Sequence, residues 1–105
     1  SIASIKLPIE SAGNYHVWHL FVIRVSNRDQ IFKSLSQLGI GVGIHYPDPL
    51  HTMSAFLKNS ERSSNLKVSE RISGEILSLP IYPGITNQQI DFVCTSLIDS
   101  VPDLK

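Results

Sequence analysis

The side chains best suited to chemistry in this sequence are four histidines and one cysteine: His16, His19, His45, His51 and Cys94. A zinc site needs three or four such ligands, usually at short spacings of the CxxC or HExxH kind. No spacing of this kind occurs here, so the sequence disfavours a metal site. Cys94 falls within an apolar helical pattern, where a thiol stays neutral and is a poor nucleophile. We therefore expect neither metal chemistry nor cysteine catalysis.

The segment from Gly41 to His51, GVGIHYPDPLH, is the stronger candidate for a binding site. Its two glycines fall on one face of an expected strand, where they allow another backbone or a ligand to approach closely. Directly after them come His45, Tyr46 and His51, on a turn stiffened by two prolines. Such rigidly held groups suit recognition of a polyhydroxylated ligand, and an ordinary proline-rich turn explains them equally well. A phosphate-binding glycine loop is excluded, because these glycines enter a strand and do not open a helix.

His19 belongs to the segment Tyr15–Val25, which is rich in β-branched and aromatic residues and predicts a strand. It shares a strand face with Val17 and Phe21, so we expect a core histidine bonded to the backbone in preference to a ligand-binding one. We expect Trp18 to pack in the same way. Both faces of this strand are largely apolar, which indicates that other parts of the structure cover each of them.

A helix over about residues 28–38 should follow this strand. Asn27 and Gln30 have the spacing of a capping box, and Gly39 stands where a helix-ending glycine belongs. Residues 40–46 then alternate between apolar and small or polar side chains, which predicts a second strand. Pro47 should end that strand, because proline cannot donate to a ladder.

The second half of the chain begins with an irregular stretch over residues 48–67, including a solvated loop at 59–65. Val68, Ile72 and Ile76 mark a short helix at i, i+4 spacing. Residues 77–82 predict a short extended piece, which Pro80 restricts to an edge or irregular strand.

A last helix should begin after Thr86, which forms a capping box with Gln89, and should stop at Pro102. Its apolar stripe includes Cys94. The order of elements predicts an α+β fold, a two-layer domain with a small, mostly antiparallel sheet and helices packed on it.

Composition narrows the classes of function. The chain has 105 residues, enough for one domain, and its nine basic and nine acidic residues balance. Binding to nucleic acid or to an anionic membrane needs a basic face, so the sequence disfavours both. The longest apolar run, Leu20–Ile23, is too short to span a bilayer. A single cysteine suits a reducing compartment, so we expect a cytoplasmic protein.

Several motifs in one order resemble the C-terminal region of the sugar aminotransferases of the DegT/DnrJ/EryC1/StrS family. The resemblance covers about residues 14–101 and is carried by HVWHLFVIR at 16–24, Gly39-Ile40, IHYPDPLH at 44–51, Ser69-Glu70-Arg71 and LSLPIYP at 77–83.

This resemblance implies an enzyme dependent on pyridoxal phosphate (PLP), with the aspartate-aminotransferase fold. Residues 1–14 would be a lead-in segment and residues 15–105 the C-terminal small domain. Its partners would be the large PLP-binding domain of the same chain, a nucleotide-linked keto-deoxysugar and a second copy in a homodimer. The amino donor would be an amino acid such as glutamate, and the product would serve cell-surface polysaccharides, such as O-antigen lipopolysaccharide, or antibiotic sugars.

The resemblance also implies site residues. His45 and Tyr46 would hydrogen-bond the sugar or its phosphates, His51 would support them, and His19 would be a further substrate-binding candidate. The strand around Trp18 resembles most the branch that acts on dTDP-linked 3-keto-6-deoxyhexoses.

The family's Schiff-base lysine has no counterpart among the five lysines here: Lys6, Lys33, Lys58, Lys67 and Lys105. We therefore expect the chain to bind no PLP and to be inactive as an aminotransferase by itself. The alternative from a different class is a stand-alone, non-catalytic ligand-binding or oligomerisation module.

Overall fold

The structure is a computed structural model that describes residues 4–57 and 66–101. Its centre is a three-stranded antiparallel sheet with the order β1-β2-β3. The strands are β1 (Ile5–Lys6), β2 (Phe21–Val25) and β3 (Ile76–Leu79). The helices are α1 (Arg28–Gln37), α2 (Ser54–Leu57), α3 (Lys67–Ser73) and α4 (Asn87–Ser100), with a 3₁₀ turn, η1, at Leu50–Thr52. The predicted α+β class is confirmed.

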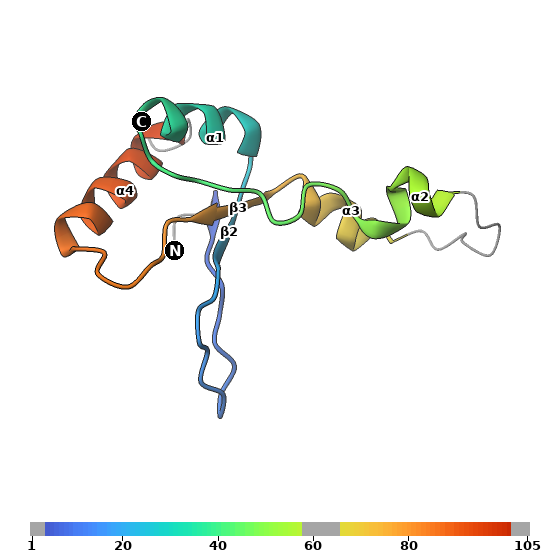
Figure 1. The fold of residues 1–105 in the computed structure, drawn as a ribbon, viewed down its shortest axis with the longest axis horizontal. Helices are drawn as coiled ribbons and strands as arrows, with labels where there is room; N and C mark the ends of the chain where they lie inside the picture. The colour runs from blue at the N-terminus through green and yellow to red at the C-terminus, as the bar shows by residue number, and fades with distance from the viewer. Residues whose placement is uncertain (1–3, 58–65, 102–105) are drawn as a thin grey trace.

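One face of the sheet carries the core. Ile23 pairs with Leu77 across β2 and β3, and both side chains are fully buried. Because side chains alternate along a strand, Val25 lies on this face too. The core is completed by Ile31 and Leu35 of α1, Ile40, and Leu97 and Val101 at the end of α4. In Figure 1 the helices α1 and α4 lie together on one side of the sheet. The two predicted layers are therefore the sheet and this pair of helices, which covers one face of it.

Helix α1 begins and ends close to its predicted bounds, but its start differs from the prediction. Asn27 has a left-handed backbone with φ of 56°, and its side chain makes no cap hydrogen bond. Its carbonyl instead accepts the backbone N–H of Gln30. The expected capping box is therefore wrong. Asparagine tolerates this backbone, so it serves as a turn residue. Gly39 has φ of 77° and ends the helix as predicted.

Helix α4 has the predicted capping box. The Thr86 side chain accepts the Gln89 N–H, and the Gln89 side chain accepts the Thr86 N–H. The helix ends at Ser100; Pro102 lies outside the described residues. Cys94 has the apolar neighbours that its pattern predicts, since it lines a hollow of about 300 Å³ with Phe21, Leu79 and Val93. The residue itself is nevertheless exposed.

Two predicted strands are shorter than their patterns. Of Tyr15–Val25, only Phe21–Val25 forms β2, and the residues before it belong to an exposed arm. Of residues 40–46, Gly43 alone bridges to Ser78 on the free edge of β3. Glycine weakens a strand, and two glycines stand at positions 41 and 43. The segment therefore forms a single bridge with β3 before Pro47 and Pro49 direct the chain away from the sheet.

The other predictions have mixed outcomes. The short helix α3 holds Val68 and Ile72, but Ile76 begins β3. β3 is an edge strand of the named sheet and ends before Pro80, as the proline predicts. Leu50–Thr52 and Ser54–Leu57 are helical, so this part of the stretch predicted to be irregular is not. The expected loop at 59–65 lies outside the described residues.

Two projections leave the helical half of the molecule (Figure 1). One is the arm of residues 7–20, where Ile9, Tyr15 and Val17 are almost fully exposed. The other carries η1, α2 and α3. The accessible surface is 7829 Å², whereas about 5,900 Å² is typical of a folded monomer of this mass. Within the described residues, helices α1 and α4 cover the core face of the sheet, and the opposite face is buried at Ser78, beside His45. The expectation that both faces are covered is therefore met only in part.

Candidate functional site

The candidate binding corner, residues 43–51, begins where Gly43 pairs with Ser78. The Gly43 N–H donates to the Ser78 carbonyl at 3.0 Å, and the Ser78 N–H donates to the Gly43 carbonyl at 2.8 Å. Nδ1 of His45 then lies 2.9 Å from Oγ of Ser78. The imidazole also passes over Gly43: a Cβ at this glycine would lie 2.7 Å from Cε1 of His45. The predicted close approach at Gly43 therefore exists, and its occupant is the histidine two residues later.

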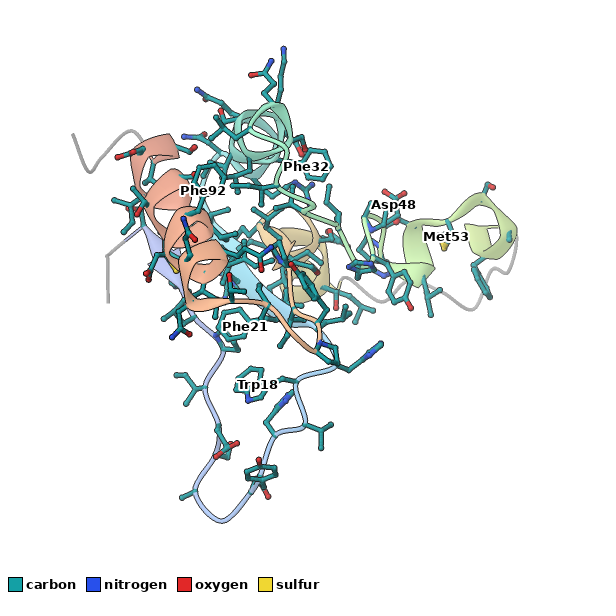
Figure 2. All side chains as sticks on the ribbon, turned by 60° about the vertical axis from the view of Figure 1, so that its left-hand side comes forward. Trp18, Phe21, Phe32, Asp48, Met53 and Phe92 are labelled. Carbon is teal, nitrogen blue, oxygen red and sulfur yellow. The ribbon has the colours of Figure 1, made fainter. Side chains whose placement is uncertain are left out.

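Tyr46 is a highly exposed group of the corner, at 79%. Its ring meets that of His45 edge to face, with centroids 6.2 Å apart. Tyr46 also lines a groove of about 590 Å³ between the proline turn and α3, whose walls are mostly apolar: Pro47, Pro49, Leu50, Met53, Val68, Ile72 and Ile76. Figure 2 shows Asp48 and Met53 on this side of the molecule, on the projection that carries α2. A polar rim above an apolar groove can hold a ligand with one face of each kind.

His51 lies on η1 and connects it to α3. Its Nε2 is 2.9 Å from Oε1 of Glu70, and its side chain is only 16% exposed. A carboxylate accepts hydrogen bonds, so Nε2 carries the proton of this pair. The arrangement suits the supporting role expected for His51, because it fixes η1 against the helix that forms the other wall of the groove.

His19 is exposed near the base of the arm, so the expectation of a core histidine is wrong. β2 begins only at Phe21, which leaves His19 outside the ladder. Within the described part of the chain, no hydrogen bond or ring contact joins it to His45, Tyr46 or His51. Trp18 does pack on other side chains, since its ring stacks on that of His16 with centroids 4.1 Å apart. It also lies next to Phe21, with centroids 5.2 Å apart (Figure 2).

A polar cluster lies on the sheet face opposite the core. Nε and Nη2 of Arg24 donate to Oε2 of Glu75 at 2.9 and 2.6 Å. This hydrogen bond from Arg24 is the largest influence on the carboxyl and lowers its pKa, with Arg71 and Lys6 adding to the effect. These residues line a small polar hollow of about 150 Å³. Within the described part of the chain, no hydrogen bond or ion pair joins them to His45 or Tyr46.

A second groove, of about 730 Å³, lies away from the corner. It runs between residues 39–41, residues 80–85 and α4, and apolar side chains such as Ile40, Ile81 and Phe92 dominate its wall. Tyr82 is the one titratable group in it. Both grooves therefore have the character of packing surfaces, and the one beside Tyr46 is distinguished by its place next to the candidate corner.

Sequence reasoning named His45 but missed Ser78 as its partner. A serine within the apolar run Ile76–Leu79 was the available signal, since a polar residue buried in a strand requires a hydrogen-bond partner. Glu70 belongs to the motif Ser69-Glu70-Arg71, but nothing in its spacing indicates that it pairs with His51.

Comparison with known proteins decides the family. The family model for the DegT/DnrJ/EryC1/StrS aminotransferases matches residues 2–98. The chain belongs to this family.

Two curated family members illustrate the similarity. The dTDP-3-amino-3,4,6-trideoxy-α-D-glucose transaminase of Micromonospora megalomicea is 38% identical over 95% of this chain and 27% of its own length. The dTDP-3-amino-3,6-dideoxy-α-D-galactopyranose transaminase of Aneurinibacillus thermoaerophilus is 37% identical over 85% of this chain and 24% of its own length.

A solved structure, NtdA of Bacillus subtilis with bound cofactor PMP, superposes with a TM-score of 0.81 at 29% identity. The superposition covers 93% of this chain and 23% of the NtdA chain. The chain thus spans about a quarter of the length of these relatives, and its fold is that of one part of such an aminotransferase.

The described residues of this family member do not fit a PLP site. A Schiff-base lysine is activated by desolvation or by a neighbouring cation in an enclosed pocket. Lys6, Lys33 and Lys67 are all exposed, and none of them lines either apolar groove. Among the described residues there is also no group of three or more metal-binding side chains. In the same residues, no helix has the length and apolar character that crossing a membrane requires.

Proposed function

We propose that this chain is the C-terminal small domain of a PLP-dependent aminotransferase that moves an amino group from glutamate to a nucleotide-linked keto-deoxysugar. The observation that carries the proposal is the family match over residues 2–98, which includes the whole candidate corner. The two curated relatives are named for dTDP sugars with an amino group at carbon 3. We therefore assign a dTDP-linked 3-keto-deoxysugar as the substrate class.

In this function the chain binds and orients the sugar. The exposed ring of Tyr46 and the imidazole of His45 would hydrogen-bond the sugar or its phosphates, and the His51–Glu70 pair would hold the groove wall in place. His19 is retained as a further candidate, which would act from the arm. Amino transfer is the chemistry of PLP, and the large domain would hold that cofactor.

The surface of the chain supports the large domain and a second copy as partners. Large apolar side chains are exposed on the arm and beside the grooves, among them Ile9, Tyr15 and Leu50. Exposed apolar patches of more than a few hundred Å² usually mark interfaces. Residues 15–105 would form the small domain and residues 1–14 would lead into it, with Ile5–Lys6 completing its sheet. We place the enzyme in the cytoplasm, where sugar nucleotides are made.

The test uses the full-length polypeptide that contains this chain, purified with PLP. Incubated with glutamate and a dTDP-linked 3-keto-6-deoxyhexose, it should release 2-oxoglutarate and an aminated sugar nucleotide, detected by mass spectrometry. His45→Ala should raise the KM for the sugar and leave the KM for glutamate nearly unchanged. Ligand binding by the chain without any amination by the full-length protein would favour the non-catalytic module instead.

A further inference from the structure

Ser78 is a buried polar residue in the middle of an apolar strand. Only 4% of it is exposed, while its neighbours along β3 are leucines. Its backbone groups are satisfied by Gly43, as described above. The hydroxyl has one recorded partner among the described residues, Nδ1 of His45 at 2.9 Å. The Ser78 hydroxyl is therefore bonded to the imidazole of His45, a candidate substrate-binding residue.

This contact determines which ring nitrogen of a neutral His45 carries the proton. If Nδ1–H donated to the serine, the buried hydroxyl hydrogen would have no acceptor among the described residues, which is costly. The hydroxyl therefore donates, and Nδ1 accepts. The proton then resides on Nε2, because the hydrogen bond at one ring nitrogen fixes the tautomer of the other.

Gly43 leaves room for the same ring on a second side. A Cβ at position 43 would come within 3.3 Å of Nδ1 and closer still to Cε1, so the ring lies directly over the glycine. The residue as a whole is exposed, and Nε2 makes no hydrogen bond among the described residues. Nε2–H is thus the free donor of a ring whose position is set by two residues.

We propose that Ser78 is a positioning residue, which holds His45 as its Nε2–H tautomer so that this N–H donates to an oxygen of the bound nucleotide sugar. This role rests on the proposed function, because Ser78 acts through His45, which binds the sugar in that function. A carbonyl, hydroxyl or phosphate oxygen can accept such a bond, and an N–H group of the ligand cannot.

The first test compares Ser78→Ala with Ser96→Ala in the full-length polypeptide. Ser96 is an equally buried serine on α4, so it controls for loss of a buried hydroxyl. Alanine at 78 keeps the backbone pairing with Gly43. Nitrogen-15 spectra of labelled histidine should show one Nε2–H tautomer of His45 in the unsubstituted protein and in Ser96→Ala. Ser78→Ala should show a mixture, and an unchanged spectrum would overturn the proposal.

The second test asks whether Ser78 acts through His45. Ser78→Ala should raise the KM for the sugar about fivefold, the loss expected for one hydrogen bond, with kcat and the KM for glutamate nearly unchanged. In a His45→Ala background the same substitution should have no further effect. An equal effect in both backgrounds would overturn the positioning role.

These readouts separate the two proposals. If the unsubstituted polypeptide aminates no sugar, the proposed function fails. The nitrogen-15 spectra then decide on Ser78 alone: a tautomer mixture in Ser78→Ala supports its hold on the ring, and identical spectra refute it.

Discussion

At the scale of single residues, the orientation of the His45 ring depends on two neighbours that contribute in different ways. Ser78 supplies a hydrogen bond, and Gly43 supplies the space in which the ring lies. Neither would reach the substrate in the proposed function. Substitutions at these positions should therefore change how well the sugar binds and should change the fold very little.

Gly43→Ala is expected to displace the imidazole, because the new Cβ would lie 2.7 Å from its Cε1. The exposed ring can rotate away, so the cost is mainly the lost bond to Ser78. In the full-length enzyme the KM for the sugar should rise about fivefold, measured by steady-state kinetics. Gly41→Ala is the matched control, since its Cβ would meet nothing within 4 Å. Equal effects of the two substitutions would contradict this account.

Glu75 should make stability depend on pH. The hydrogen bond from Arg24 lowers the pKa of this carboxyl below its ordinary value of 4.5. A lowered pKa in the folded state means that the stabilisation is complete above about pH 4.5 and is lost as the pH falls through the folded value. The pair is partly exposed and screened by solvent, so Glu75→Gln should cost roughly 0.2–1 kcal/mol at pH 7.

This difference should shrink as the pH falls below 4.5, which thermal unfolding of this chain at several pH values can measure. Asp91→Asn, which changes an exposed carboxylate on α4, provides the control. A difference between Glu75→Gln and the unsubstituted chain that stays constant from pH 7 to acid would show that the ion pair contributes nothing.

At the scale of elements, the start of α4 is the clearest case of local sequence fixing local structure. Thr86 and Gln89 exchange side-chain and backbone hydrogen bonds. Thr86→Ala should destabilise the chain by about 1 kcal/mol, measured by urea unfolding followed by circular dichroism. Thr95→Ala, an exposed threonine within the helix, should cost much less. Similar losses for the two would mean that the capping box does not stabilise α4.

The helices were predictable because their signals are local. The stripes at Ile31, Leu35 and Leu97 and the positive φ of Gly39 follow from residues within a few positions. The strands were less predictable, because an alternating pattern does not reveal whether a partner lies alongside. Residues 15–20 and 40–46 have that pattern and lack a continuous partner among the described residues.

The candidate site was predictable in part for the same reason. His45, Tyr46 and His51 lie within seven positions, and their common turn follows from the prolines. Ser78 and Glu70 join them only through tertiary contacts across 33 and 19 positions. His19 was placed in the core because the strand pattern was extended too far towards the N-terminus.

At the scale of the whole molecule, the chain has a core on one face of its sheet and large exposed surfaces elsewhere. The arm of residues 7–20 and the projection with η1, α2 and α3 extend away from that core (Figure 1). Grooves with mostly apolar walls remain open among the described residues, for example beside Tyr46 and beside α4. Such a surface is expected of a domain that packs against a larger body, which agrees with a match to about a quarter of each relative.

The central claim is that this chain binds the sugar while PLP is held elsewhere in the same protein. The most direct test is to reduce the PLP-loaded full-length polypeptide with borohydride and to map the modified lysine by peptide mass spectrometry. The account predicts a single phosphopyridoxyl-lysine outside this sequence. A stoichiometric adduct on Lys6, Lys33, Lys58, Lys67 or Lys105 would contradict it.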